Sequence, residues 1–217
     1  MKIRPWNFCA SVLCVVVFSG SLTACAPIIF GGAAMGALVA TDRRTSGAQL
    51  EDEGIELRAA GRIRESLGDR VHINVTSYNR QVLVTGEVPN VQDKQLVEQI
   101  VSRVENVRSM VNEIALLGNT TLTQRSSDVL TTGKVKAAMV DAKDLYSNAF
   151  KVVTERGTTY LMGLVTQREA TRATDITRGT GGVLKVVRIF EIISEAELQR
   201  TLPQPAPASN QPAAPKT

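Results

Sequence analysis

Residues 71–88 read VHINVTSYNRQVLVTGEV, and residues 150–165 read FKVVTERGTTYLMGLV. In each stretch, apolar and polar residues alternate on both sides of a short turn, at residues 78–80 in the first and at Gly157 in the second. Alternation with a period of two predicts half-buried strands, and the turn between two such strands predicts a β-hairpin. The sequence therefore predicts the same hairpin twice in one chain.

Helical patterns flank both hairpins. Before the first hairpin, apolar residues recur every four positions, at Ile55, Ala59, Ile63 and Leu67, and the acidic residues 51–53 mark the start of that helix. After it, Asn90 can cap a second helix, and residues 107–116 form a last strand. Residues 51–117 thus predict the order helix–strand–strand–helix–strand.

Residues 128–193 follow the same course. Val135 and Met139 of their first helix take the places of Ile63 and Leu67, residues 167–180 form the second helix, and residues 183–193 form the closing strand. A repeated order of elements indicates an old duplication. The predicted fold class is α+β, with two tandem domains that each cover a small three-stranded mixed sheet with two helices. Residues 118–127 are the predicted linker.

One glycine stands within the second strand of each hairpin, Gly86 in VTGEV and Gly163 in LMGLV. A glycine inside a strand lets another part of the chain approach closely, or forms a bulge. We therefore predict a structural role for both. A bulkier residue at Gly163 is expected to disturb the helix beside it.

The N-terminus predicts secretion and lipidation. Residues 1–24 combine Lys2 and Arg4 with an 11-residue apolar run, too short to span a bilayer, and this is the layout of a signal peptide. Residues 22–25 (LTAC) resemble the bacterial lipobox, which predicts cleavage before Cys25 and acylation of that cysteine, palmitate included. The alternative is an ordinary signal peptide. Because Ala26 rather than Asp follows the cysteine, the predicted location is the periplasmic face of the outer membrane, with anchoring through the acyl chains.

The segments outside the two repeats have biased compositions. Residues 25–50 predict a lipidated N-terminus and tether, either a flexible lead-out or a short membrane-surface helix. Residues 194–217 end in PQPAPASNQPAAPKT, which has five prolines and no apolar period, and they predict a disordered Pro/Ala-rich tail.

The composition argues against catalysis, metal binding and nucleic-acid binding. The 217 residues include one His and only 4% aromatic residues, little material for a metal site, a His-based triad or a base-stacking surface. His72 has no cysteine, second histidine or sequence-local carboxylate at ligand spacing. The sequence therefore predicts no enzyme, no catalytic residue, no cofactor, no metal site and no nucleic-acid partner.

The two repeats differ in charge. Residues 51–117 carry eight Lys or Arg against eleven Asp or Glu, whereas residues 128–193 carry ten against seven. An anionic bilayer attracts the second repeat and repels the first, since each Lys or Arg near such a surface contributes ~1 kcal/mol. The alternative is that the two repeats attract each other.

The first helix of the second repeat carries the predicted lipid-binding residues. At 100° per residue, the face opposite its core is apolar and is flanked by two lysines: Leu130, Gly133, Lys134, Lys136, Ala137 and Val140. This layout is typical of interfacial helices. The alternative is a contact with the other domain or with a protein partner. The corresponding face of the first repeat holds polar residues such as Arg58, Arg62 and Glu65.

A second apolar face lies on the hairpin of the second repeat, at Tyr160, Met162 and Leu164. The matching positions of the first repeat are more polar. We expect this face to dock the first domain.

The repeated units, each with a glycine near the end of its second strand, resemble BON domains. The lipobox and the strings TDRRT and YLMGLVT, in order and spacing, resemble lipoproteins with two such domains. The resemblance implies a non-enzymatic periplasmic protein that binds anionic phospholipid (phosphatidylglycerol or cardiolipin) through its second domain, maintains outer-membrane integrity under envelope stress, and takes part in cell division. It also implies that the helix with Leu130 touches lipid, although the family's lipid-binding member has Trp there. The alternative function is an adaptor that binds envelope proteins and regulates envelope assembly or a cell-wall amidase.

Overall fold

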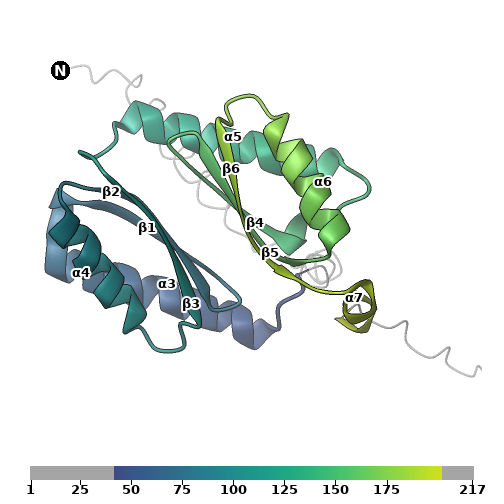
Figure 1. Cartoon of the computed structure of the whole chain (residues 1–217), viewed down its shortest axis with the longest axis horizontal. Helices are drawn as coiled ribbons and strands as arrows, with labels where there is room; N and C mark the ends of the chain where they lie inside the picture. Colours follow the sequence, from purple (N-terminus) through teal and green to yellow (C-terminus); the bar gives the residue numbers. More distant parts are fainter. Residues whose placement is uncertain (1–41, 202–217) are drawn as a thin grey trace, which may run out of the picture. The chain divides into compact units, whose positions relative to one another are not determined.

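The computed structural model describes residues 42–201, and Figure 1 shows its helices and strands. The predicted signal peptide and Cys25 lie outside these residues. The first domain runs in the order α3 (Ser46–Leu67), η1 (Gly68–Arg70), β1 (His72–Tyr78), β2 (Gln81–Val88), α4 (Val91–Ser102) and β3 (Ser109–Leu116). The second contains α5 (Leu122–Asp141), η2 (Ser147–Ala149), β4 (Phe150–Glu155), β5 (Thr158–Val165), α6 (Gln167–Arg178) and β6 (Lys185–Ile192), and α7 (Glu195–Thr201) follows.

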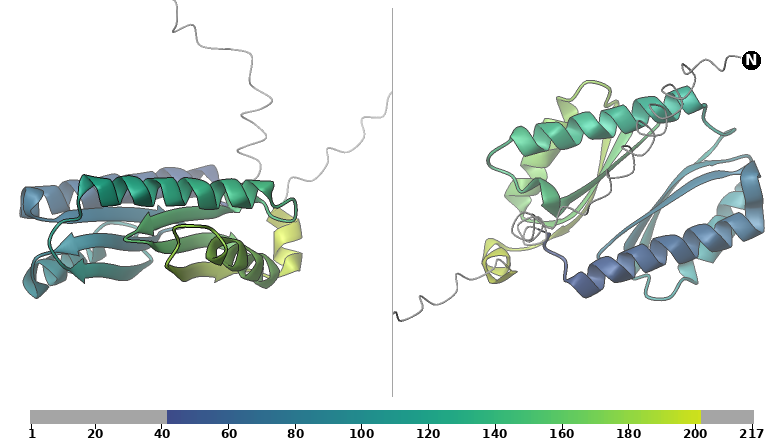
Figure 2. Two further views of the ribbon diagram at one scale, coloured as in Figure 1. Left: turned by 90° about the horizontal axis from the view of Figure 1, so that it is seen from above. Right: turned by 180° about the vertical axis from the view of Figure 1, so that it is seen from behind.

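Each domain contains one mixed three-stranded sheet. In the order β1–β2–β3, the central strand β2 pairs antiparallel with β1 and parallel with β3. The sheet β4–β5–β6 repeats this pattern. Both helices of a domain cover the same face of its sheet (Figures 1 and 2). The predicted α+β fold with two tandem repeats is confirmed.

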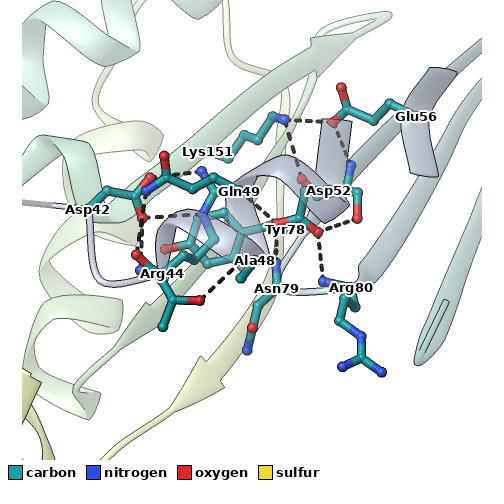
Figure 3. Close-up of polar contacts among 12 residues, drawn as sticks. Asp42, Arg44, Ala48, Gln49, Asp52, Glu56, Tyr78, Asn79, Arg80 and Lys151 are labelled. Atoms are coloured by element: carbon teal, nitrogen blue, oxygen red, sulfur yellow. Dashed lines mark hydrogen bonds and ion pairs between the residues drawn. The ribbon is translucent and has the colours of Figure 1, made fainter. Parts of the chain in front are cut away.

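A carboxylate on the first helix fixes the hairpin turn of each domain. Asp52 on α3 accepts hydrogen bonds from the backbone N–H groups of Asn79 and Arg80, both at 2.7 Å. Asp128 on α5 accepts them from Arg156 and Gly157, both at 2.9 Å. These turns have positive φ angles, and an ionised acceptor strengthens the bonds that hold them. Figure 3 shows Asp52 at the centre of this network.

The equivalence of Asp52 and Asp128 corrects two predictions. It pairs Val135 with Ala59, and Met139 with Ile63, one helical turn away from the predicted match. In addition, α3 begins at Ser46, with the Thr45 side chain accepting a hydrogen bond from the N–H of Ala48. The acidic residues 51–53 therefore lie inside the helix rather than at its start, and Asp52 binds the turn instead of stabilising a helix end.

The uncovered faces of the two sheets pack against each other. Side chains from both domains form one buried apolar cluster: Tyr78, Leu83, Tyr160, Met162 and Ile189. Polar pairs surround this cluster, among them Lys151–Glu56 at 2.6 Å and Arg108–Glu191 at 2.5 Å. The predicted docking of the first domain on the Tyr160–Met162 face is confirmed. These opposite charges also match the alternative in which the two repeats attract each other.

A short segment before α3 ties the two domains together. Arg43 binds the Glu169 carboxylate of α6 with two hydrogen bonds, at 2.6 and 2.8 Å, and also donates to the Leu164 carbonyl. Arg44 pairs with Asp52 at 2.8 Å and lies 4.3 Å from the centre of the Tyr78 ring (Figure 3). Arg43 thus contacts the second domain, and Arg44 contacts the first.

Three segment predictions need correction. Residues 42–50, assigned to the tether, are ordered through Arg43, Arg44 and the start of α3. The linker is shorter than 118–127, because α5 begins at Leu122, where the Thr121 side chain accepts a hydrogen bond from the N–H of Gln124. In the segment assigned to a disordered tail, residues 195–201 form α7, with Leu198 buried. The rest of the tail, residues 202–217, lies outside the described residues.

Candidate lipid-binding face of the second domain

Helix α5 has a buried side that fixes its rotation. Asp128, Thr131, Val135 and Met139, spaced three and four residues apart, are buried against the second sheet. Because one side of the helix is held by this packing and by the bonds from Asp128 to the hairpin turn, the opposite side must face outward. The helix is therefore a rigid support for the residues on its outer side.

All six predicted lipid-binding residues are exposed on this outer side: Leu130, Gly133, Lys134, Lys136, Ala137 and Val140. Leu130 is 65% exposed and Val140 is 66% exposed, so neither is covered by the first domain. The alternative of a contact with the other domain is thereby excluded for these two side chains within the described structure.

Two further apolar residues extend this face. Leu122 is 78% exposed and Val129 is 71% exposed, and at 100° per residue both fall on the same side of α5 as Gly133 and Val140. From Leu122 to Val140 the apolar strip is about 27 Å long at 1.5 Å per residue. The prediction missed Leu122 because it placed the linker there, although Thr121 followed by Gln124 matches a helix-start signal. We call these eight residues, the six predicted plus Leu122 and Val129, the α5 outer face.

The C-terminal end of the α5 outer face borders a cavity of about 410 Å³. Lys136, Met139, Val140 and Phe150 line it together with Asp42, the first described residue. The chain from Cys25 therefore enters the described structure beside this face. The 16 residues between Cys25 and Asp42 can span at most about 56 Å.

An aromatic ring lies just beyond the same end of α5. Tyr146 is 51% exposed, and the Arg43 guanidinium lies 5.9 Å from the centre of its ring. Tyrosine is a residue type suited to the headgroup level of a membrane, since it is amphipathic. Tyr146 therefore supplies, near the end of α5, the amphipathic ring that the aliphatic side chain of Leu130 does not have.

The difference in exposed apolar side chains between α5 and α3 of the first domain is smaller than predicted. Leu50 and Leu57 on α3 are 70% and 75% exposed, so that helix also exposes apolar side chains. What distinguishes α5 is its pair of lysines, since the neighbours of Leu57 on α3 include Glu56, which binds Lys151, and Arg58, which binds Glu51. No helix among residues 42–201 is both long and apolar enough to cross a bilayer.

The burial of Tyr160 and Met162 bears on the alternative function, in which the protein is an adaptor that binds envelope proteins. These side chains are 5% and 0% exposed because they pack in the cluster between the domains. A partner protein cannot reach them while the domains are packed together. Their substitution would therefore report on domain packing rather than on partner binding.

Comparisons with known proteins agree with this architecture. The BON domain model matches residues 53–118 and 127–193. The chain is 32% identical over 195 residues to "Outer membrane lipoprotein DolP" of Haemophilus influenzae, covering 89% of this chain and 100% of that protein. It is 28% identical to the "21 kDa hemolysin" of Actinobacillus pleuropneumoniae, covering 70% of this chain and 79% of that protein. The predicted outer-membrane location agrees with the name of the Haemophilus relative.

Among solved structures, CdsD of the Chlamydia trachomatis type III secretion system is 13% identical and has a TM-score of 0.27, covering 73% of this chain and 99% of that one. A score this low supports no argument about function or domain arrangement. The two matched domains and the similarity over nearly the whole length are sufficient by themselves: this chain belongs to the BON domain family and is a DolP-like protein with two BON domains in tandem.

Proposed function

We propose that this protein is a non-enzymatic outer-membrane lipoprotein, acylated at Cys25, that binds anionic phospholipid through the α5 outer face. Leu130 and Val140 insert into the acyl boundary, while Lys134 and Lys136 lie near the phosphates. Phosphatidylglycerol and cardiolipin are the expected ligands because both present negative charge at the membrane surface. Through this contact the protein maintains outer-membrane integrity.

One observation carries the proposal: an exposed apolar strip with a lysine on each side, located next to Asp42, the point where the chain from Cys25 enters the described structure. Shallow insertion of methyl groups with ammonium groups at the phosphates is the usual arrangement of an interfacial helix. The short connection to Cys25 keeps this face within reach of the bilayer that holds the acyl chains.

The test is vesicle binding by the mature chain from Ala26 onward, which lacks the acylated cysteine. The fragment must include Arg43 and Arg44, because both contribute to domain packing. We expect binding to phosphatidylcholine vesicles that contain phosphatidylglycerol or cardiolipin, and weak binding to phosphatidylcholine alone. Raising the salt concentration should weaken binding, since surface charges are screened within ~8 Å at physiological ionic strength.

Removing both lysine charges should weaken binding strongly. Lys134→Gln with Lys136→Gln is expected to cost about 2 kcal/mol, or about 30-fold in affinity, at ~1 kcal/mol per cation. The matched control is Lys185→Gln with Arg188→Gln, which removes two exposed cations of β6 in the same domain. Equal loss in both double variants would mean that only net charge matters. Unchanged binding in the first would reject the proposed face.

Leu130→Ser tests insertion separately from charge. We expect it to reduce binding at high salt more than at low salt, because the apolar contribution remains when the charges are screened. Leu57→Ser on α3 is the control, since Leu57 of the first domain is even more exposed than Leu130, and it should leave vesicle binding unchanged. The measurement is vesicle co-sedimentation at two salt concentrations.

A further inference from the structure

Three side chains that could hold a metal ion meet at one edge of the interface between the domains. His72 begins β1, Glu87 is its partner in register on β2, and Glu155 ends β4 of the second domain. One potential ligand atom from each lies within 4.8 Å of the other two. Two atoms bound to the same Zn²⁺ at ~2.1 Å with tetrahedral geometry are about 3.4 Å apart, so modest side-chain adjustment would bring this set to coordination distance.

Glu87 has a buried carboxylate oxygen that no hydrogen bond satisfies within the described residues. Its side chain is 0% exposed, and its Oε2 atom lies 3.0 Å from His72 Nδ1 and accepts hydrogen bonds from the N–H and hydroxyl of Thr120. Its Oε1 atom is buried and has no hydrogen-bond partner among the described residues. The Arg156 guanidinium, 43% exposed, forms a long ion pair with Oε1 at 3.8 Å, beyond hydrogen-bond distance. A buried carboxylate oxygen without a hydrogen bond is costly, and a half-exposed cation at that distance offsets only part of the cost.

Glu155 adds a second buried carboxylate to the same place. Its side chain accepts a hydrogen bond from Asn74 at 2.8 Å across the interface. The pKa of Glu155 is raised, chiefly by burial; Asn74 and His72 oppose the rise, and the neighbouring carboxylates of Glu87 and Asp128 add to it. Negative groups are thus crowded at this edge of the interface.

We propose that His72, Glu87 and Glu155 bind one divalent transition-metal ion, with Zn²⁺ as the preferred ion. One imidazole nitrogen and two carboxylate oxygens are a donor set that suits Zn²⁺ better than Mg²⁺ or Ca²⁺, which prefer oxygen ligands alone. Thr120 on Glu87 and Asn74 on Glu155 already hold the carboxylates in place, as outer-shell partners do in metal sites. Water supplies the fourth ligand.

The site has an access route and a structural consequence. A cavity of about 380 Å³ is lined by His72, Asn74 and Glu155 and gives an ion a way in. Two ligands belong to the first domain and one to the second, so a bound ion would tie the domains together. This grouping could not be predicted from the sequence, because Glu87 and Glu155 lie 15 and 83 residues from His72.

The chain itself makes the test specific. The fragment from Ala26 onward contains His72 as its only histidine and no cysteine, so any imidazole–zinc contact must involve His72. We expect calorimetry to show one Zn²⁺ per chain, and NMR to show the imidazole signals of His72 shifting in parallel. Thermal unfolding should move to higher temperature with Zn²⁺, since an ion that binds only the folded state stabilises it. Mg²⁺ at the same concentration should do neither.

Variants separate this site from adventitious binding. Glu155→Gln, which removes the one ligand from the second domain, should weaken Zn²⁺ binding at least about 10-fold, and His72→Ala should abolish the one-to-one binding. The control is Glu191→Gln, which also removes an interdomain carboxylate but lies at Arg108 and Asn79, away from His72. Unmoved imidazole signals in the unaltered fragment, or equal binding in His72→Ala, would overturn the proposal. Because the NMR measurement uses the unaltered fragment, it remains decisive if a variant fails to fold.

Discussion

Gly86→Ala is expected to unfold the first domain, the largest effect that we expect from an added methyl group at any glycine among residues 42–201. A Cβ atom at Gly86 would lie 1.9 Å from the carbonyl oxygen of His72, and the φ angle of Gly86 is +116°. The clash is with backbone of the paired strand β1, so no side-chain rotation can relieve it, and the φ region adds strain of its own. We expect a loss of more than about 4 kcal/mol in the free energy of unfolding, measured by chemical denaturation.

Alanine substitutions at two other glycines provide comparisons for Gly86→Ala. A Cβ at Gly163 would lie 2.6 Å from the carbonyl oxygen of Ala149 in η2, with no positive φ to add strain, so Gly163→Ala should cost less, about 1–3 kcal/mol. The neighbour at Gly163 is thus the short turn after α5, rather than the helix predicted from the sequence. Gly133→Ala on the α5 outer face meets nothing within 4 Å and should stabilise the helix by about 0.5–1 kcal/mol. If Gly86→Ala were as mild as Gly133→Ala, the close approach of β1 would be wrong.

Arg43→Ala is expected to cost about 3–5 kcal/mol, because it leaves the Glu169 carboxylate buried without its partner. The side chains of this pair are only 4% and 0% exposed, and the arginine makes two hydrogen bonds to the carboxylate. Arg43→Lys should recover only part of the loss, since an ammonium group cannot bind both oxygens in the same way. Removing all residues before Ser46 should cost more than Arg43→Ala, because it also removes Arg44, which pairs with Asp52, and the Thr45 cap of α3.

A second ion pair serves as the control. Arg58 and Glu51 lie 2.7 Å apart with side chains 36% and 31% exposed, so Arg58→Ala should cost less than about 1 kcal/mol. Comparable losses in the two variants would show that burial of the Arg43 pair is not what matters. The measurement is again the free energy of unfolding.

The pH dependence of the free energy of unfolding gives an independent check on the Arg43–Glu169 ion pair. Burial acts to raise the pKa of Glu169, but the hydrogen bonds from Arg43 and Thr166 outweigh it, and the net pKa is lowered. The stabilising contribution is therefore present above the pKa of an unfolded glutamate and is lost as the pH falls through the lowered value in the folded state. In Arg43→Ala, burial raises the pKa of Glu169 instead. Protonation of Glu169 at low pH then removes the buried, unpaired charge, and the variant loses less stability. The stability difference between the two proteins should narrow on acidification.

Local patterns in the sequence were enough to predict the order of elements in each repeat, the hairpins and the core side of each first helix. Alternation over residues 150–165, the Asn90 cap and the spacing of the buried residues on α5 are local patterns. Each is set by neighbours a few residues away, through backbone geometry and one-sided burial. For the same reason the outward position of Leu130 and Val140 followed directly from that spacing.

Which distant side chains meet depends instead on how the two domains pack. Arg43 reaches Glu169 over 126 residues, and Asn74 reaches Glu155 over 81. The Asn74–Glu155 contact exists because Tyr78, Leu83, Tyr160 and Met162 bury their apolar surface between the two sheets and so bring β1 and β4 together. The Arg43–Glu169 contact exists because the segment before α3 reaches α6 of the other domain. No periodicity within one domain encodes that juxtaposition, since it depends on how one folded face fits another.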